Sequence, residues 1–168
     1  MKHAAEKVVS AYATLDTPLG ALLLGGDGSD VLLIGFPEGP NAVSPREGWV
    51  YDPGLYREAR RQLADYFTGR RHGFDFPMRM IGTAFQKMVW EALLAIPFGV
   101  TRTYGAIAAE IGRPSAVRAV GAANGANPLP IVVPCHRLVS STGGLIKFGG
   151  GLAAKRFLLD LENQARTS

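Results

Sequence analysis

Cysteine is almost absent from this chain, which has one cysteine, at position 135, among 168 residues. A single cysteine excludes an internal disulfide, because that bond needs two thiols. It also excludes the zinc sites that are built from several spaced cysteines. His3 and His72 stand apart from other ligating residues, so we expect neither a metal site nor a cofactor. What remains is one free thiol, which suits a reducing compartment.

Long apolar runs are also missing. No window approaches the ~20 apolar residues that cross a bilayer, and residues 1–7 lack the apolar core of a signal peptide. We therefore expect no membrane partner and a cytoplasmic location, associated with the nucleoid if the source is bacterial.

Acidic residues are scarce in the second half of the chain. Residues 82–168 carry 9 Lys and Arg against 4 Asp and Glu, whereas residues 1–81 carry 9 against 10. The net charge of +4 therefore arises from the second half. This charge makes a polyanion such as nucleic acid a candidate partner. A basic surface that only keeps the protein in solution explains it equally well.

Apolar residues, by contrast, make up 47% of the chain, which is enough to form a core. Asp52-Pro53 predicts the start of a helix that ends at Gly69, with Asp52 as its N-cap. Before this helix, apolar patterns bounded by turn residues predict strands over residues 8–15, 21–24 and 31–36. The first half is thus expected to be a small α/β scaffold, and we place a domain boundary near residue 80.

The second domain, residues 81–168, is expected to be mainly helical. Thr83 and Gln86 form a capping box. Thr103 can cap another helix, and a glycine-containing turn at residues 112–115 separates that helix from one over residues 116–124. This arrangement predicts a helix-turn-helix.

The second helix of this pair has few long side chains. Arg118 and Asn124 are the exceptions among many alanines and glycines. A major-groove reader needs several long polar side chains, so contact with the minor groove of DNA fits this helix better. Tight packing between helices would explain the small residues as well, and both interpretations stay open.

The chain around the cysteine is expected to be extended. We predict a short buried strand at residues 131–133, a small hairpin over residues 138–146, a flexible loop at 148–151 and a last helix over 152–164.

Cys135 is followed by His136 and Arg137, which could favour the reactive thiolate. Neighbouring side chains of a strand point to opposite faces. Cys135 and His136 can therefore act together only if Pro134 has turned the chain or a water bridges them. Glu162, on the last helix, could orient the histidine. A lone cysteine is more often a small buried apolar residue, so these residues alone leave its role open.

The sequence around Cys135 resembles the active-site signature of the O6-alkylguanine-DNA alkyltransferases, the methylated-DNA-cysteine methyltransferases. The signature is Asn127-Pro128-Leu129-Pro130-Ile131 followed by Pro134-Cys135-His136-Arg137. Further segments match in order and spacing, densely over residues 82–162 and loosely before them. These segments are Gly82-Thr83-Ala84-Phe85-Gln86, Val89-Trp90, Ile96-Pro97-Phe98-Gly99, Thr103-Tyr104-Gly105, Arg118-Ala119-Val120-Gly121 and Gly149-Gly150-Gly151-Leu152.

The resemblance implies an α/β (α+β) protein: a ribonuclease-H-like domain at residues 1–80 and a helical domain with the helix-turn-helix at 81–168. It implies direct DNA repair, in which the alkyl group of O6-alkylguanine, and also of O4-alkylthymine, passes irreversibly to the cysteine. The protein would bind double-stranded DNA through the minor groove, flip the damaged base and act once, as a monomer without a cofactor.

The resemblance also implies residue roles. The catalytic group comprises Cys135 as alkyl acceptor, His136 as its base through a water, Glu162 as the orienting acid, Asn127 as the brace of the turn, and Tyr104 as the contact to base and phosphate. Arg118 resembles the finger that fills the gap left by the flipped base. The other expected DNA contacts are Tyr104, Thr103, Ser115, Ala119, Ala122 and Asn124, and the expected substrate pocket is formed by Val133, Pro134, Phe148, Gly149 and Gly150.

Two departures from the family pattern stand out. Phe148 takes a position at which the family often has tyrosine, and Ile146-Lys147 replaces a small Thr-Gly pair. These changes put the preference for alkyl groups of different size in doubt. The N-terminal cysteines with which some relatives bind structural zinc are absent.

Three alternatives to the transferase fit these residues less well. An alkyltransferase-like module that binds damaged DNA without repairing it would lack the cysteine. A cysteine hydrolase would need an oxyanion hole and a base distant in sequence. A sequence-reading regulator would need longer side chains on its second helix.

Overall fold

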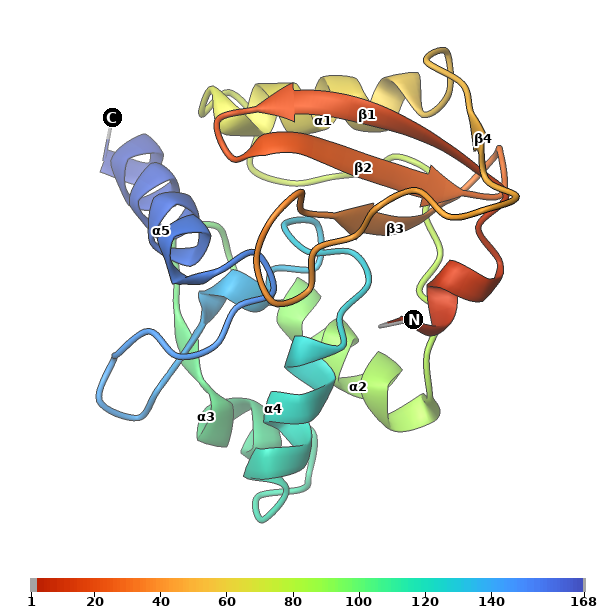
Figure 1. Ribbon diagram of the computed structural model, residues 1–168. Coiled ribbons are helices and arrows are strands. Elements are labelled where there is room, and N and C mark those ends of the chain that lie inside the picture. The colour runs from red at the N-terminus through yellow and green to blue at the C-terminus, as the bar shows by residue number, and fades with distance from the viewer. Residues whose placement is uncertain (1–2, 168) are drawn as a thin grey trace.

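The structure is a computed structural model that describes residues 3–167 (Figure 1). Met1 and Lys2, which begin the segment without an expected signal core, lie outside the described residues, as does Ser168. The first half forms a four-stranded sheet in the order β3-β2-β1-β4. Strands β1, β2 and β3 are antiparallel neighbours, and β4 runs parallel to β1. Their bounds are Ala11–Thr17, Gly20–Gly26, Val31–Gly35 and Val50–Tyr51.

The three predicted strands are present, but the first begins later than expected. A short 3-10 helix, η1 (Ala4–Lys7), occupies the chain up to the start of the predicted strand. The backbone becomes extended only at Ala11. Strand β4 was not predicted, because two exposed residues within a loop-like segment carry no readable pattern.

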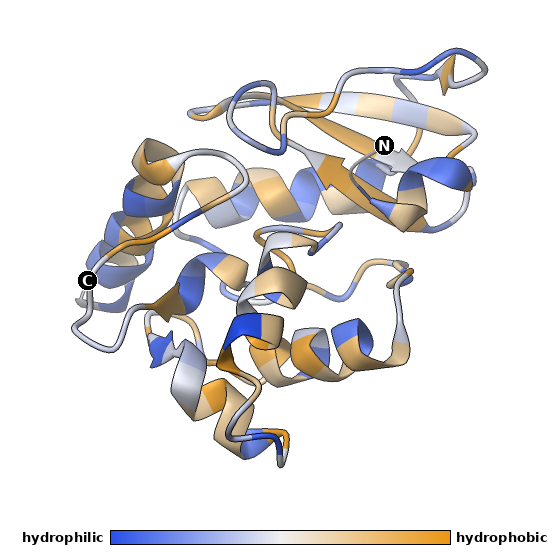
Figure 2. Ribbon diagram, turned by 60° about the horizontal axis from the view of Figure 1, so that its bottom comes forward, coloured by the Kyte–Doolittle hydropathy of each residue, from blue (hydrophilic) through white to orange (hydrophobic). Residues whose placement is uncertain are grey.

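Helix α1 (Arg57–Phe67) starts five residues after the predicted cap at Asp52. The Asp52 carboxylate accepts a hydrogen bond from the Gly54 N–H at 2.8 Å, so it caps a turn instead of a helix. Tyr56 then adopts a left-handed φ of 52°, which no helix can contain. The apolar face of α1 is buried from Ala59 to Phe67 and covers the sheet, as the apolar stripe along α1 indicates (Figure 2).

The second half is mainly helical, as predicted. The capping box of Thr83 and Gln86 is formed, with both hydrogen bonds present. Thr103 caps its helix by accepting a hydrogen bond from the Ala106 N–H at 3.1 Å. The four helices are α2 (Ala84–Leu94), α3 (Tyr104–Glu110), α4 (Val117–Gly125) and α5 (Leu152–Thr167). Helices α3 and α4 pack together across a short turn and form the predicted helix-turn-helix.

The predicted strand at residues 131–133 is wrong. Ile131 adopts a left-handed φ of 73°, and the Val133 N–H donates to the Leu129 carbonyl at 2.8 Å. These features close a turn, after which Cys135–Arg137 forms a second 3-10 helix, η2. The run of apolar residues reflects burial, not extension, since every residue of it is buried.

The predicted hairpin over residues 138–146 is also wrong. Its turn is present, because Ser140 and Gly144 are joined by backbone and side-chain hydrogen bonds. However, β6 (Leu138–Val139) pairs in parallel with β5 (Arg102–Thr103), so the partner strand lies before α3. Sequence patterning identified the turn but not the distant partner.

One core joins both halves. A single cluster of buried side chains includes Leu22 and Tyr66 from the first half together with Trp90, Leu129 and Cys135 from the second. The Ile34 N–H donates to the Pro128 carbonyl at 2.8 Å, which ties β3 to the chain before the cysteine. No helix within residues 3–167 combines the length and apolar character that a membrane crossing needs.

Candidate active site

Asn127 fixes the turn that carries the cysteine. Its side chain accepts a hydrogen bond from the Leu129 N–H at 2.9 Å and donates to the Val133 carbonyl at 2.8 Å. Both groups lie within one bend of the chain, so one amide closes it from inside. Cys135 and His136 lie in the 3-10 helix that follows, so their side chains do not point to opposite faces as they would in a strand. The chain therefore turns at Pro134, which is one of the two conditions under which Cys135 and His136 can act together; the other is a bridging water.

The Cys135 thiol lies inside the protein, with 5% of the residue exposed. Burial raises its pKa to about 11, although a hydrogen bond from Asn127 and the positive charge of Lys155 act in the opposite direction. The thiol is therefore protonated near neutral pH. A base must remove its proton before it can attack.

His136 is fully buried beside Glu162, with its Nε2 2.7 Å from the Glu162 Oε1. Burial raises the pKa of Glu162, but hydrogen bonds from His136 and Arg137 outweigh it and hold this pKa well below its usual range. The glutamate is thus a carboxylate, which only accepts hydrogen bonds, so the His136 Nε2 carries the proton. Burial lowers the pKa of His136, which keeps the ring neutral. Its Nδ1 then presents a lone pair and has no hydrogen-bond partner among residues 3–167.

Glu162 is held by more donors than the histidine alone. Arg137 donates to both carboxylate oxygens at 2.8–3.2 Å and to the Ile96 carbonyl at 2.6 Å. The Tyr66 hydroxyl, on α1, donates at 2.8 Å, and the Gly99 N–H donates at 3.2 Å. The guanidinium that sequence reasoning placed near the thiol therefore pairs with the carboxylate instead.

Lys155 is a second buried cation near the cysteine. Its ammonium group donates to the Leu138 carbonyl at 2.5 Å and to the Ile146 carbonyl at 3.0 Å. Burial lowers its pKa, and the neighbouring Cys135 raises it. Lys155 thereby fastens the start of α5 to Leu138 and to Ile146, which lie on either side of the turn at residues 140–144.

A small pocket opens beside the thiol. Phe148 and Gly149 line one part of it, and Phe36 of the first half lines another. The Phe148 and Phe36 rings meet edge to face with centroids 5.4 Å apart. A Cβ at Gly150 would lie 2.9 Å from the Phe36 ring, so this loop position admits only glycine without a shift of the ring. The glycines after Phe148 thus let the loop close against β3.

Comparison with known proteins identifies the family. A methylated-DNA–protein-cysteine methyltransferase from Methanosarcina acetivorans is 46% identical over 151 residues, which cover 90% of this chain and 97% of that protein. A Mycobacterium tuberculosis protein of the same name is 48% identical over 90% of this chain and 91% of its own length. Two family models match in tandem, the ribonuclease-like domain of 6-O-methylguanine DNA methyltransferase over residues 11–80 and its DNA binding domain over residues 84–164.

The chain belongs to the 6-O-methylguanine DNA methyltransferase family. The crystal structure of Mycobacterium tuberculosis OGT in complex with DNA superposes with a TM-score of 0.86 at 46% identity, covering 92% of this chain and 94% of that one. The two-part fold, with a sheet domain followed by a helical domain, is therefore that of the methyltransferase family.

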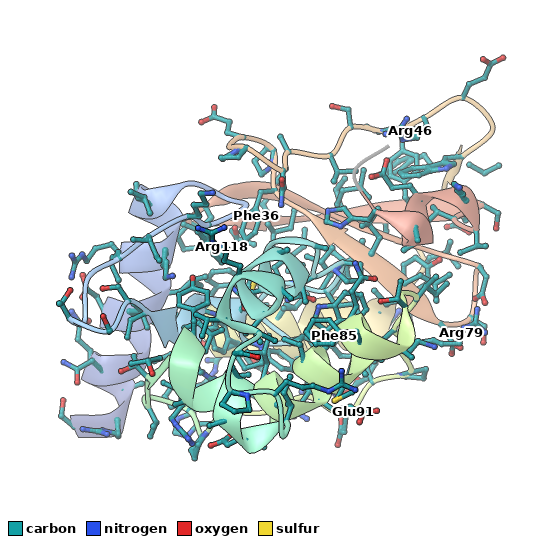
Figure 3. All side chains as sticks on the ribbon, turned by 90° about the horizontal axis from the view of Figure 1, so that it is seen from below. Phe36, Arg46, Arg79, Phe85, Glu91 and Arg118 are labelled. Atoms are coloured by element: carbon teal, nitrogen blue, oxygen red, sulfur yellow. The ribbon has the colours of Figure 1, made fainter. Side chains whose placement is uncertain are left out.

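In this methyltransferase the residues expected to contact DNA fall into two groups. Ser115, Arg118, Ala119 and Ala122 are exposed on the helix-turn-helix. Arg118 extends from α4, which lies in front in the view from below (Figure 3). Thr103 and Tyr104 are half-buried where α3 begins, and Asn124 is buried beside the Cys135 carbonyl. The structure thus places Asn124 inside the protein with the thiol, away from the exposed face of α4.

The residues expected to form the substrate pocket are similarly divided. Phe148 and Gly149 line the pocket beside the thiol, and Gly150 packs behind it. Val133 is fully buried, with its carbonyl bound by Asn127. Pro134 faces a different pocket, near Phe98.

Sequence reasoning missed Tyr66, Lys155 and Asn41. Asn41 joins the loop after β3 to the site, since its side chain donates to the Gly125 carbonyl at 2.8 Å and its N–H to the Gly149 carbonyl at 2.9 Å. Tyr66 and Asn41 bond to residues at least 84 positions away along the chain, so no local pattern could identify them. Lys155 alone carried a usable signal, a charged residue within the apolar stripe of a helix.

Proposed function

We propose that this protein repairs DNA by transferring the alkyl group of O6-alkylguanine, and also of O4-alkylthymine, from double-stranded DNA to Cys135. The observation that carries the proposal is the buried His136–Glu162 pair beside a protonated thiol, in a chain of the methyltransferase family. Relatives with nearly half of their residues identical bear the name methylated-DNA–protein-cysteine methyltransferase.

The residues suit a displacement at saturated carbon. A water passes the Cys135 proton to the free Nδ1 of His136, and Glu162 stabilises the charged ring that results. The sulfur then bonds to the alkyl carbon while the carbon–O6 bond breaks, and its electron pair returns to guanine. Tyr104 can donate a proton to the leaving base, because burial and then the neighbouring Cys135 raise its pKa and keep the phenol protonated.

The helix-turn-helix supplies the DNA contact in this proposal. Its exposed α4 face carries Ala119 and Ala122, whose short side chains let the backbone approach a shallow minor groove. The damaged base must leave the stack to reach a buried thiol, which costs a few kcal/mol. Arg118, exposed on the same helix, fills the gap that the flipped base leaves.

The product limits the protein to one turnover. Transfer creates a thioether at Cys135, which water does not cleave, and the chain has no second cysteine to regenerate the thiol. The proposal further assigns the scaffold role to residues 1–80 and the reaction to residues 81–168. It takes the protein to be a monomer in the cytoplasm, or at the nucleoid of a bacterium, where the DNA substrate and a reducing environment coincide.

The mass of the intact protein tests the proposal. After incubation with duplex DNA that holds O6-methylguanine, we expect one added methyl group, located on Cys135 by peptide mapping. Cys135→Ser should gain no methyl group while still binding DNA. If the wild-type protein gained no methyl group, the proposed transfer would be refuted. If more moles of guanine were repaired than protein was present, the single turnover would be refuted.

A further inference from the structure

Asn124 is buried beside the reactive cysteine with one polar atom unused. The residue is 6% exposed and lies in the last turn of α4. Its Nδ2 donates to the Cys135 carbonyl at 3.4 Å, and the same amide lies close enough to the Tyr104 hydroxyl to lower the pKa of that phenol. The Oδ1 has no hydrogen-bond partner within the described chain, residues 3–167.

The orientation of this amide is fixed by its neighbours. The Cys135 carbonyl only accepts hydrogen bonds, so the amide must turn its NH2 group, and not its oxygen, towards that carbonyl. With the NH2 group turned towards Cys135, the free Oδ1 is left for the pocket that Asn124 lines with the thiol. A buried oxygen without a donor is energetically unfavourable, so a partner supplied by the substrate would recover that cost.

The chemistry of alkylated bases restricts what that partner can be. Alkylation at O6 removes the proton from N1 of guanine, so the ring nitrogens and O6 only accept hydrogen bonds. The exocyclic 2-amino group is then the one donor of the base within reach of a pocket that holds O6 at the thiol. An O4-alkylthymine has lost its N3 proton and offers no hydrogen-bond donor of this kind.

We propose that the Oδ1 of Asn124 accepts a hydrogen bond from the 2-amino group of the flipped O6-alkylguanine and thereby makes the site prefer alkylguanine over alkylthymine. This inference rests on the proposed transfer function. A site with a buried polar group rejects a substrate that leaves the group unpaired far more strongly than an apolar pocket rejects a change in shape. Asn124 is therefore a specificity residue, not a contact to the DNA backbone.

A pair of substrates that differ only in the 2-amino group tests the inference. We would measure second-order rate constants of methyl transfer from duplexes with O6-methylguanine and with O6-methylhypoxanthine, which lacks that group. For the unchanged protein we expect guanine to react about tenfold faster or more. With Asn124→Leu the ratio should fall towards one, mainly because transfer from guanine becomes slower.

Matched variants separate the lost acceptor from a disturbed pocket. Asn124→Asp keeps an oxygen acceptor and should retain the preference for guanine, although both rates fall. Asn41→Leu removes another amide that lines the pocket, and should lower both rates by the same factor. Asn124→Ala serves as a smaller second removal if the leucine variant does not fold.

The possible outcomes are distinct. A wild-type ratio near one, or a leucine or alanine variant that keeps the wild-type ratio, would show that Oδ1 is satisfied by water and overturn the inference. Absence of methyl transfer from O6-methylguanine to the unchanged protein would instead refute the proposed function.

Discussion

The Cys135 side chain is held almost entirely as the protonated thiol, which is the unreactive form. With a pKa of about 11, only about one molecule in ten thousand carries a thiolate near pH 7. In the proposed mechanism the neutral His136, which is held by the carboxylate of Glu162, removes this proton. If the proposed mechanism holds, burial protects a nucleophile that is used once, and the relay makes it reactive.

The pH dependence of transfer should reveal this relay. In the unchanged protein the rate should be nearly flat above about pH 7, because burial lowers the pKa of His136 and the ring is already neutral there. With His136→Ala the rate should fall by about 10²–10⁴-fold. It should then rise about tenfold per pH unit up to about pH 10, since the thiolate fraction grows with pH below the thiol pKa.

Timed mass measurements over the pH range would check both profiles. Circular dichroism at each pH controls for unfolding of the variant. A flat profile for His136→Ala would mean that another group takes the thiol proton, and Lys155 would be the next residue to replace.

Single residues of this site were predictable where rarity and spacing marked them. Cys135 is unique in the chain and His136 adjoins it, and Glu162 is one of few acids in the second half. The unused Oδ1 of Asn124 was not predictable, because it depends on which neighbours take the two N–H donors of the amide. The reactive groups can be predicted from the sequence, whereas their hydrogen-bond partners can be identified only from the folded structure.

Helix α4 divides its small residues between two faces. Val120 and Ala123 are buried, and the Trp90 indole donates to the Ala123 carbonyl at 2.8 Å. Ala119 and Ala122 are exposed, so no other helix covers them. Packing therefore explains the inner small residues, and the proposed approach of α4 to DNA would account for the outer ones.

A larger side chain on the outer face should disturb DNA binding alone. Ala122→Leu changes an exposed position, so the free energy of unfolding should move by no more than about 0.5 kcal/mol. The added side chain holds the α4 backbone away from the groove, and we expect affinity for duplex DNA to fall by about tenfold or more. Ala64→Leu makes the same change on the exposed side of α1 and should leave binding unaltered. Equal affinities for the two variants in a fluorescence-anisotropy titration would exclude α4 as the DNA contact.

Elements with local signals were predicted, and those that depend on distant partners were not. The caps at Thr83 and Thr103 each rest on hydrogen bonds over three residues, so their spacing is visible in the sequence. The turn at Ile131 and the pairing of β6 with β5 depend on the surrounding fold. Apolar residues near Ile131 indicated burial correctly but could not specify the backbone conformation.

The two halves of the molecule meet at the site and complete it together. The sheet half contributes Phe36 to the pocket, Asn41 to the active-site loop and Tyr66 to the carboxylate of Glu162. Sequence analysis treated this half as a scaffold without chemistry, because each of these residues lies at least 84 positions from its partner along the chain. Because Tyr66 donates a hydrogen bond to Glu162, we expect this half to affect the reaction as well as the stability.

Replacing Tyr66 with phenylalanine tests whether the sheet half influences the active site through Glu162. The change removes the hydroxyl that donates to Glu162 at 2.8 Å and keeps the ring that packs in the shared core. Loss of one hydrogen bond to a buried charge should lower the free energy of unfolding by about 1.5–3 kcal/mol. A less firmly held Glu162 orients His136 less well, so transfer should also slow by several-fold.

Tyr56→Phe provides the matched control, since its hydroxyl accepts from the Gly28 N–H and donates to the Ala11 carbonyl within the sheet half. We expect that variant to lose stability, as measured by urea denaturation, without a change in the transfer rate of the folded protein. If both phenylalanine variants transferred methyl groups at the wild-type rate, the sheet half would support the fold alone and the relay would be complete without it.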